Sequence, residues 1–281
     1  MDKYLILNAD DFGYNEQQTR AIRELYSAGL ISSTSLMAVA PCARDAANHA
    51  AADGFPVGIH LTVNSDDEAN RWHSISGKVS LSDSRGLYSK QSALALHAKR
   101  RDVRAELEAQ YNFITGTGAR IDHADNHCAT LYGINGRRFF VDAYDFCREH
   151  RLPYRFPKRP DFLSRQLGRA VPKPVISLHG MIVNAGVKRG VRLLDDLVSD
   201  PRPIERIKNF ESLREYYINA VDSCIEGVTE MFLHPAYPID GTLGGWMKRV
   251  YEFELLKSGD ILERAKKNNI KVVSWAVFDT L

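Results

Sequence analysis

The regular alternation of short β-rich runs with longer helical patterns is the feature that most constrains the fold of this 281-residue chain. The pattern predicts strands at residues 4–7, 36–39, 56–59, 119–124, 154–156, 175–178, 229–233 and 271–275. It predicts helices at residues 17–28, 43–52, 102–115, 139–150, 212–226 and 250–268. Strands that alternate with helices favour βαβ units and a mostly parallel sheet. About seven or eight strands favour closure, so the predicted fold is α/β, a deformed, TIM-barrel-like (β/α) barrel.

The chain is expected to form one catalytic domain over residues 1–281, because no linker or internal repeat divides it. Two insertions interrupt the barrel pattern, near residues 64–100 and 157–174. The first is polar and too long for a simple loop, and the second is basic and rich in proline. Insertions of this length on a barrel often act as lids or substrate walls. The alternative is that these insertions are solvent-exposed loops without a functional role.

The charged residues almost balance, with 37 Lys and Arg against 35 Asp and Glu and a net charge of +2. This balance gives no reason to expect a nucleic acid or an anionic membrane as a partner. No apolar stretch approaches the length of a transmembrane helix, and the first residues do not resemble a signal peptide. A cytoplasmic location is therefore expected.

The four cysteines are Cys42, Cys128, Cys147 and Cys224, and no two of them form a CxxC pair. They do not indicate a disulfide framework, and small buried thiols are the simplest interpretation. Cys128 lies inside the candidate site, so its role is left open.

Polar side chains stand where six of the strand-like segments end. A lone histidine after a strand is more often structural, but six such ends together favour a shared site. In a barrel the carboxyl ends of the strands converge on one face, where the active site lies. The residues concerned are Asp10 and Asp11, His60, Asp125 and His127, Arg155, His179, and His234.

The residue types in this set indicate metal-dependent hydrolysis. The sequence has no GxSxG elbow and no glycine-rich phosphate loop, so neither a serine nucleophile nor a nucleotide cofactor is indicated. A carboxylate with two histidines is a common set for a hydrolytic metal centre that keeps positions open for water and substrate.

Asp10 and Asp11 are adjacent, so they need different roles if both lie in the site. Successive residues that leave a strand point in different directions, so one can bind the metal while the other takes a proton. The alternative is a turn or a helix cap before Gly13. His123 is a weaker metal candidate than His127, because in an extended segment it is expected to be a core or supporting histidine.

Six short motifs, spread over nearly the whole chain, carry a family resemblance. They are NADDFG at 8–13, GLISSTSLM at 29–37, GIHL at 58–61, HADNH at 123–127, HP at 234–235, and Arg249 with Glu252, Glu254 and Leu256. With these motifs the chain resembles the YdjC-like carbohydrate deacetylases, distant relatives of the NodB-type polysaccharide deacetylases. The resemblance implies a deformed barrel that removes the acetyl group from a small N-acetylated saccharide, such as the chitooligosaccharide diacetylchitobiose.

The resemblance also implies roles for single residues. The metal ligands that it implies are Asp11, His60 and His127. It makes Asp10 the catalytic base and His234 the general acid, and Arg155 would orient the Asp10 carboxylate. The family is associated with one divalent metal ion, often Mg²⁺, although two histidines would also suit Zn²⁺. A homodimer is implied as well.

The chain departs from the family where a histidine-rich run usually follows, since it reads His127-Cys128-Ala129 there. This departure affects substrate contacts more than the metal, and it motivates one alternative, a catalytically silent sugar-binding protein. A second alternative is another metal-dependent barrel chemistry, such as sugar isomerisation or phosphoester hydrolysis. The basic residues between 158 and 169 would meet a substrate phosphate or, more simply, solvent.

Overall fold

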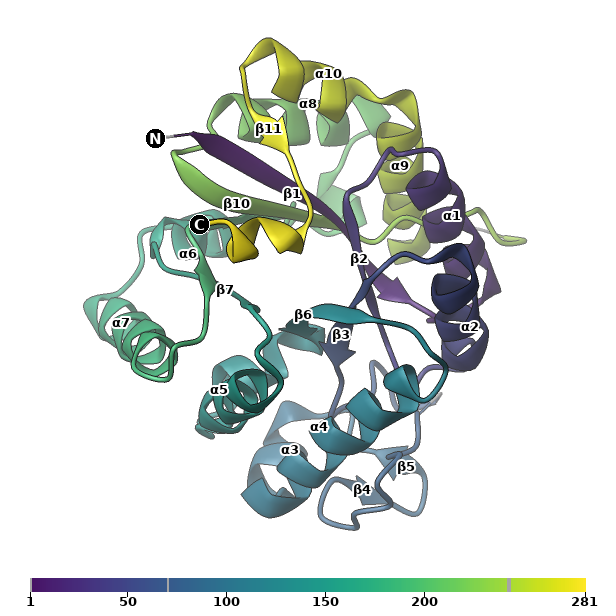
Figure 1. Ribbon diagram of the computed structural model, residues 1–281, viewed down its shortest axis with the longest axis vertical. Coiled ribbons are helices and arrows are strands. Elements are labelled where there is room, and N and C mark those ends of the chain that lie inside the picture. Colours follow the sequence, from purple (N-terminus) through teal and green to yellow (C-terminus); the bar gives the residue numbers. More distant parts are fainter. Residues whose placement is uncertain (1, 70, 242–243) are drawn as a thin grey trace.

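The computed structural model describes residues 2–69, 71–241 and 244–281. Among these residues nine strands form one sheet, with helices around it (Figure 1). Every hydrogen-bonded pair in this sheet is parallel. The strands are β1 (Lys3–Phe12), β2 (Ser33–Leu36), β3 (Val57–Leu61), β6 (Ile121–Asn126), β7 (Tyr154–Pro157), β8 (Leu193–Leu194), β9 (Asp196–Val198), β10 (Gly227–Leu233) and β11 (Lys271–Val272).

The segment that contains β8 and β9 closes this sheet. β8 pairs with β7 and β9 pairs with β10, and only Asp195 stands between the two short strands. The strand order β8-β7-β6-β3-β2-β1-β10-β9 therefore returns to the segment where it began. β11 pairs with the first half of β1, whereas β2 pairs with its second half. The predicted α/β fold with a deformed, mostly parallel barrel is confirmed.

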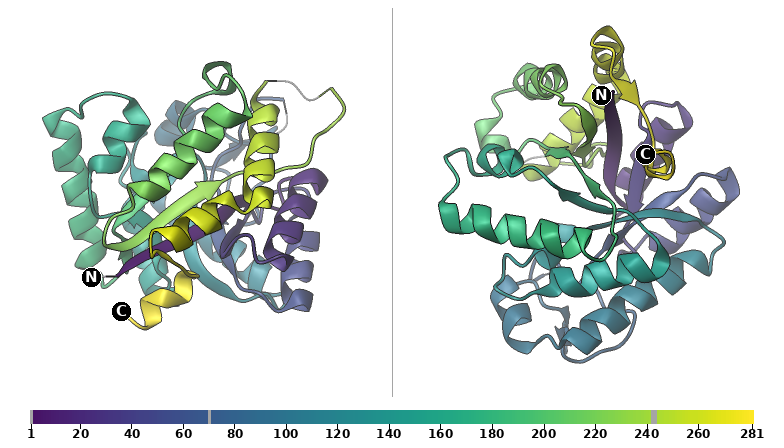
Figure 2. Two further views of the ribbon diagram at one scale, coloured as in Figure 1. Left: turned by 90° about the horizontal axis from the view of Figure 1, so that it is seen from above. Right: turned by 60° about the vertical axis from the view of Figure 1, so that its left-hand side comes forward.

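The helices lie outside the barrel, and most of them connect consecutive strands (Figure 2). None of the described helices is long and apolar enough to cross a membrane. They are α1 (Glu16–Ser27), α2 (Ala43–Asp53), α3 (Gln91–His97), α4 (Arg100–Thr115), α5 (Phe139–His150), α6 (Asp161–Leu167), α7 (Lys173–Val187), α8 (Phe210–Asp222), α9 (Gly245–Ser258) and α10 (Asp260–Lys267). Three 3-10 segments join them: η1 (His127–Tyr132), η2 (Ile204–Arg206) and η3 (Trp275–Asp279).

The strand predicted at residues 175–178 is wrong, because this run lies inside α7. A short apolar run does not distinguish a strand from a buried helix, and Pro174 near the start of α7 favours the helix. His179 therefore lies on a helix and not at a strand end.

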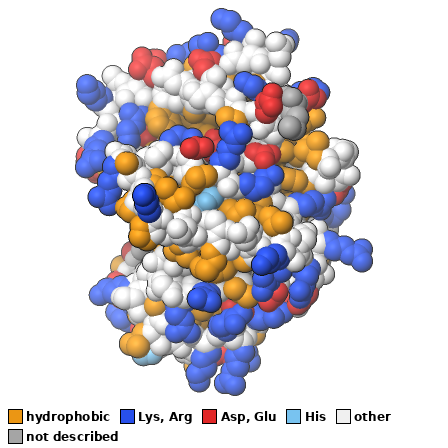
Figure 3. All heavy atoms as spheres, turned by 90° about the vertical axis from the view of Figure 1, so that its left-hand side faces the viewer, with side chains coloured by type: hydrophobic (Ala, Val, Ile, Leu, Met, Phe, Trp, Pro, Cys, Tyr) orange, Lys and Arg blue, Asp and Glu red, His pale blue; other side chains and the backbone are white. Residues whose placement is uncertain are grey.

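Hydrophobic side chains also appear at the surface on the side of the molecule that carries α6 and α7 (Figure 3).

Several predicted boundaries also differ from the structure. The helix predicted at residues 212–226 ends at Asp222, and the strand predicted at residues 271–275 ends at Val272, with Trp275 in η3.

Residues 250–268 were predicted as one helix, but α9 and α10 are separated by Gly259, whose left-handed φ of +77° ends the first helix. The second strand was predicted at residues 36–39, whereas β2 ends at Leu36. Its first three residues, Ser33-Thr34-Ser35, are all buried. Because their side chains are polar, a hydrophobic pattern does not indicate a strand at these positions.

The described residues of both insertions include regular secondary structure. Residues 64–100 contain α3 and an antiparallel hairpin of β4 (Ser82–Asp83) and β5 (Gly86–Leu87). Residues 157–174 contain α6 and the beginning of α7.

Trp275 of η3 is buried beside the barrel interior, where it packs with Ile6, Leu194 and Val228. Its ring stacks on the ring of His123, with 4.4 Å between the centroids and 8° between the planes. His123 is fully buried, and its Nδ1 lies 2.6 Å from the Asp122 carboxylate. His123 is therefore a packing residue in this structure.

Gly58 leaves the space that the His123 ring fills. A Cβ atom at position 58 would lie only 2.2 Å from two atoms of that ring. We expect Gly58→Ala to lower the free energy of unfolding by about 1–3 kcal/mol, because overpacking a filled core forces neighbouring groups to move. Urea denaturation monitored by circular dichroism measures this change.

Gly180→Ala is the matched control, because no atom lies within 4 Å of the Cβ that it would add in α7. Alanine is the better helix former, so this control should keep or slightly raise the stability. Equal stability of Gly58→Ala and wild type would contradict the packing role of the glycine.

Candidate active site

A bulge at the end of β1 directs two adjacent carboxylates into one cavity. The pairing of β1 with β2 shifts between Ala9 and Phe12, and Asp11 has a left-handed φ of +66°. In a regular strand Asp10 and Asp11 would point to opposite faces, but here both line the same cavity. A non-glycine residue in this conformation costs on the order of 1–3 kcal/mol, so surrounding contacts must hold it.

Three ligand atoms converge at this bulge. Asp11 Oδ1 lies 3.3 Å from His60 Nε2 and 3.7 Å from His127 Nδ1, and these two nitrogens are 3.3 Å apart. Metal–ligand bonds of about 2.0–2.2 Å place neighbouring ligand atoms about 3–3.6 Å apart. All three residues are buried. Their spacing therefore fits a single metal ion.

Two further carboxylates determine which ring nitrogens face this point. Asp125 Oδ1 lies 2.8 Å from His60 Nδ1, and Asp66 Oδ1 lies 2.5 Å from His127 Nε2. Because each carboxylate accepts the ring N–H, the other nitrogen of each ring keeps its lone pair. Asp11 Oδ1 is buried and has no hydrogen-bond partner. Three lone-pair atoms that face one another repel each other unless positive charge lies between them, and either protons or one divalent metal ion can supply that charge.

The pKa values of His60 and His127 also indicate that this point favours positive charge. Burial disfavours the charged form of His60, but the carboxylates of Asp125 and Asp11 outweigh burial and raise its pKa to about 10. The pKa of His127 is raised well above its ordinary value for the same reason, because Asp11 and Asp66 outweigh burial. A metal ion at this point would compete with these protons.

Arg155, the second residue of β7, binds the Asp10 carboxylate on both oxygens, at 2.6 and 2.7 Å. Asp10 Oδ1 also accepts a hydrogen bond from the Asn8 side chain at 2.7 Å. The buried guanidinium further contacts Glu230 at 2.7 and 2.9 Å and Asp125 at 2.8 Å. Burial raises the pKa of Glu230 to about 7, although Arg155 opposes this shift. One cation thus orients Asp10 within a cluster of buried carboxylates.

His234 follows β10 and lines the same cavity. Its Nε2 lies 3.9 Å from Asp10 Oδ2, and Glu252 accepts its backbone N–H at 2.7 Å. The His234 side chain is partly exposed, yet burial still lowers its pKa. Its protonated form is therefore a stronger proton donor than an ordinary imidazolium.

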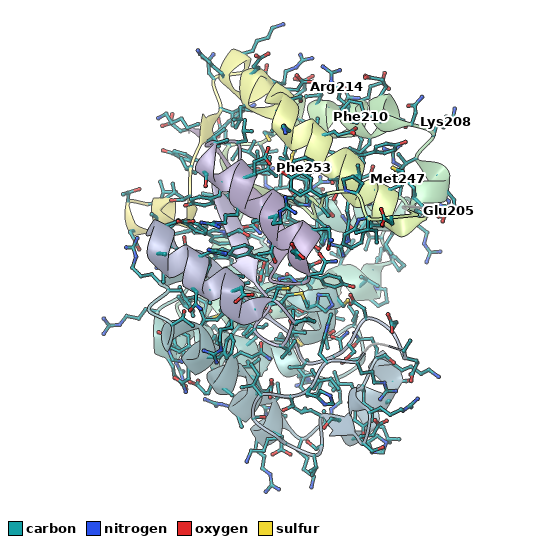
Figure 4. The ribbon with its side chains drawn as sticks, turned by 90° about the vertical axis from the view of Figure 1, so that its right-hand side faces the viewer. Glu205, Lys208, Phe210, Arg214, Met247 and Phe253 are labelled. Atoms are coloured by element: carbon teal, nitrogen blue, oxygen red, sulfur yellow. The ribbon has the colours of Figure 1, made fainter. Side chains whose placement is uncertain are left out.

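Arg249 of α9 is a site residue to which the sequence analysis assigned no role. It donates to Asp11 Oδ2 and to the Gln18 side chain, both at 2.9 Å. α9 lies beside α8 and α1, with Phe253 between α9 and α1 (Figure 4). Arg249 and Glu252 are three residues apart on α9, a spacing that places both on one helix face and was the available signal.

The first insertion contributes Asp66 and Trp72 to the site, and no sequence signal identified either residue. Asp66 holds His127, as described above, and the Trp72 ring lies edge-on to the His127 ring with 5.4 Å between centroids. The Tyr14 ring lies edge-on to the Trp72 ring, with 5.8 Å between the centroids. An aromatic wall therefore stands next to His127.

The cavity has a volume of about 420 Å³. It brings together all six residues to which the sequence analysis assigned catalytic or metal-binding roles: Asp10, Asp11, His60, His127, Arg155 and His234.

Of the three other candidates, His179 and His123 stand apart from this cavity, whereas Cys128 is one of its lining residues. His179 donates to or accepts from no site residue, and its Nε2 lies 2.9 Å from the backbone oxygen of Pro157. Burial lowers the pKa of His179. Cys128 is exposed at the cavity rim, 3.7 Å from Asp66 Oδ1, with a left-handed φ of +52°. His123 packs against Trp275, as shown above.

Comparison with known proteins identifies relatives along the whole chain. The profile of the YdjC-like protein family matches residues 4–267. A protein named carbohydrate deacetylase from Geobacillus stearothermophilus is 31% identical, with 99% of each chain covered. Another of the same name, from Thermoanaerobacter pseudethanolicus, is 27% identical over 98% of this chain and 99% of its own.

A solved structure shows the same fold. It is a provisionally named cellobiose-phosphate cleavage protein from Enterococcus faecalis, with a TM-score of 0.76 and 24% identity over 99% of both chains.

The raised pKa of Glu230 predicts how stability depends on pH. An acid whose pKa is about 7 when folded and near 4.5 when unfolded binds its proton more tightly in the folded state. Its contribution to stability is therefore complete below about pH 4.5 and is lost as the pH rises through about 7. We expect the unfolding free energy of wild type, relative to Glu230→Gln, to fall by about 2.5 kcal/mol between pH 5 and pH 8.

Urea denaturation in EDTA at a series of pH values tests this expectation. Glu254→Gln is the control, because Glu254 is exposed on α9 and its variant should follow the wild-type profile. Parallel profiles for wild type and Glu230→Gln would show that Glu230 does not titrate in this range.

Proposed function

The chain belongs to the YdjC-like protein family, and from this premise we propose that it is a metal-dependent carbohydrate deacetylase acting on a small N-acetylated saccharide. One observation carries the proposal: three buried lone-pair atoms converge within 3.7 Å beside a carboxylate and a histidine that line the same cavity. The relatives named carbohydrate deacetylase cover nearly the whole of both chains, and they support the reaction class. The proposed substrate is a chitooligosaccharide such as diacetylchitobiose.

Asp11, His60 and His127 would hold one divalent metal ion. When bound, such an ion supplies a Lewis acid that polarises the amide carbonyl and lowers the pKa of water. The family resemblance favours Mg²⁺. The donor set of two imidazoles and one carboxylate suits Zn²⁺, so both metals enter the test.

Asp10 acts as the general base that takes a proton from the attacking water. Arg155 holds both of its oxygens, which fixes the direction of the carboxylate. His234 lies on the same cavity and donates a proton to the leaving nitrogen. A bond forms between the water oxygen and the acetyl carbon, the C–N bond breaks, and the products are acetate and a free amino sugar.

Acetate release from N,N′-diacetylchitobiose tests the proposal. We expect release by the purified protein with added Mg²⁺ or Zn²⁺ and none in EDTA. Asp10→Asn and His234→Ala should each lower turnover by at least about 10²-fold while metal analysis after dialysis still finds the ion. Asp11→Ala should lose the ion itself.

His73→Ala is the control for unspecific metal binding, because His73 is an exposed histidine of the first insertion. It should keep both metal and turnover. Tight sugar binding without acetate release, for either metal, would support a catalytically silent sugar-binding protein instead. Near-normal turnover of Asp10→Asn would remove Asp10 from the role of base.

A further inference from the structure

A second cavity adjoins the candidate active site. Its volume is about 320 Å³, and it lies among η1, α6, α7 and the ends of β7, β9 and β10. The two cavities share four lining residues: Ala129, Tyr132, Leu197 and Phe232. The two cavities are therefore neighbours, and these four residues stand between them.

The walls of the second cavity are apolar, with Phe162 from α6 and Leu178 and Ile182 from α7 among them. None of the described residues that line it is charged at neutral pH, since burial lowers the pKa of His179. The polar groups already have partners: His179 Nε2 lies 2.9 Å from the Pro157 oxygen, and the Gln166 amide contacts Ser199 at 3.1 Å. The cavity therefore suits a hydrocarbon group and not a sugar ring or a phosphate.

The junction between the two cavities lies next to the reacting groups. Phe232 is shared by both cavities, and its ring is 4.6 Å from the guanidinium carbon of Arg155. The same ring is 5.8 Å from the ring of His234. Of the four shared residues, Ala129 contributes only a methyl group, so the wall between the cavities is thinnest in side-chain bulk at this residue.

Three further aromatic residues that could stack on a sugar lie on the Asp11 side of the site. Trp72 contacts His127, and the Tyr14 and Trp246 rings lie 5.2 and 5.6 Å from the guanidinium carbon of Arg249, which holds Asp11. The acyl group and the amine of an amide extend in different directions from the carbonyl carbon. The sugar therefore belongs on the aromatic side and the acyl group on the Phe232 side.

We propose that the second cavity binds the acyl chain of the substrate amide, so that the protein hydrolyses N-acyl sugars whose chains are longer than acetyl. This inference rests on the proposed function and extends it from deacetylation to deacylation. An apolar cavity of about 150 Å³ is sufficient to bind benzene. A cavity of about 320 Å³ is thus far larger than the methyl of an acetyl group requires.

The chemistry needs water alone as co-reactant. The water oxygen bonds to the acyl carbon, the C–N bond breaks, and the nitrogen receives a proton. The products are a short-chain carboxylate and the amino sugar.

The test compares chitobiose that carries acetyl, butyryl or hexanoyl groups on both nitrogens. We expect kcat/KM to rise with chain length by about fourfold for each methylene that is buried. Leu178→Asp places a charge in the wall of the cavity at a position that is 40% exposed, so folding should tolerate it. This variant should lower the ratio of hexanoyl to acetyl kcat/KM by at least about tenfold.

Ile176→Asp is the matched control, because Ile176 lies on the same helix, is 42% exposed and does not line the cavity. It should leave the ratio unchanged. Acetate release with a wild-type kcat/KM that falls from acetyl to hexanoyl would overturn the acyl-chain assignment and leave the proposed function intact.

Calorimetric binding of the same three compounds to the Mg²⁺-loaded protein separates the two proposals. If no acyl group is released but the hexanoyl compound binds more tightly than the acetyl compound, the cavity assignment is supported and the proposed hydrolysis is overturned. Equal binding of all three compounds overturns the cavity assignment whatever the activity.

Discussion

The guanidinium group of Arg155 lies in the barrel interior, in contact with carboxylates from three other strands. Asp10 comes from β1, Asp125 from β6 and Glu230 from β10, and all three lie within 2.9 Å of the β7 arginine. One cation therefore ties four strands together, and its loss would leave several buried charges unpaired. The metal cradle depends on the same group, because Asp125 also bonds His60 and so determines which ring nitrogen faces Asp11.

The adjacent carboxylates Asp10 and Asp11 differ chiefly in what surrounds them. The bulge at the end of β1 places both in one cavity, so position in the strand does not distinguish them. Arg155 donates hydrogen bonds to both oxygens of Asp10. Arg249 donates only to Oδ2 of Asp11, so Oδ1 of Asp11 faces the two histidine nitrogens. Two neighbouring residues of identical chemistry thus suit different proposed tasks, one as a fixed base and one as a metal ligand.

The barrel supplies the reacting groups, and the insertions supply the walls around them. The first insertion places Asp66 and Trp72 against His127. The second supplies Phe162 to the apolar cavity, where α7 adds Ile182. The hydrogen-bonded sheet holds the strands rigidly, whereas connecting segments can vary in length at little cost. The reacting groups therefore lie on the strands or directly after them, and the residues that would select the substrate lie on the connecting segments.

The sequence alone was sufficient for the alternating fold and for most of the strands that carry the candidate residues, because strand and helix patterns depend on residues only a few positions apart. The same local reasoning failed at residues 175–178, where a short apolar run fits both structures and only the 15-residue helix around it decides. Local reasoning also could not predict the contacts that form the site. Arg155 is 145 residues from Asp10 in the sequence, and Arg249 is 238 residues from Asp11. No local sequence pattern indicates contacts between residues so far apart. Closure of the barrel by residues 193–198 brings them together, and with them the apolar cavity and the choice of which carboxylate oxygen stays free.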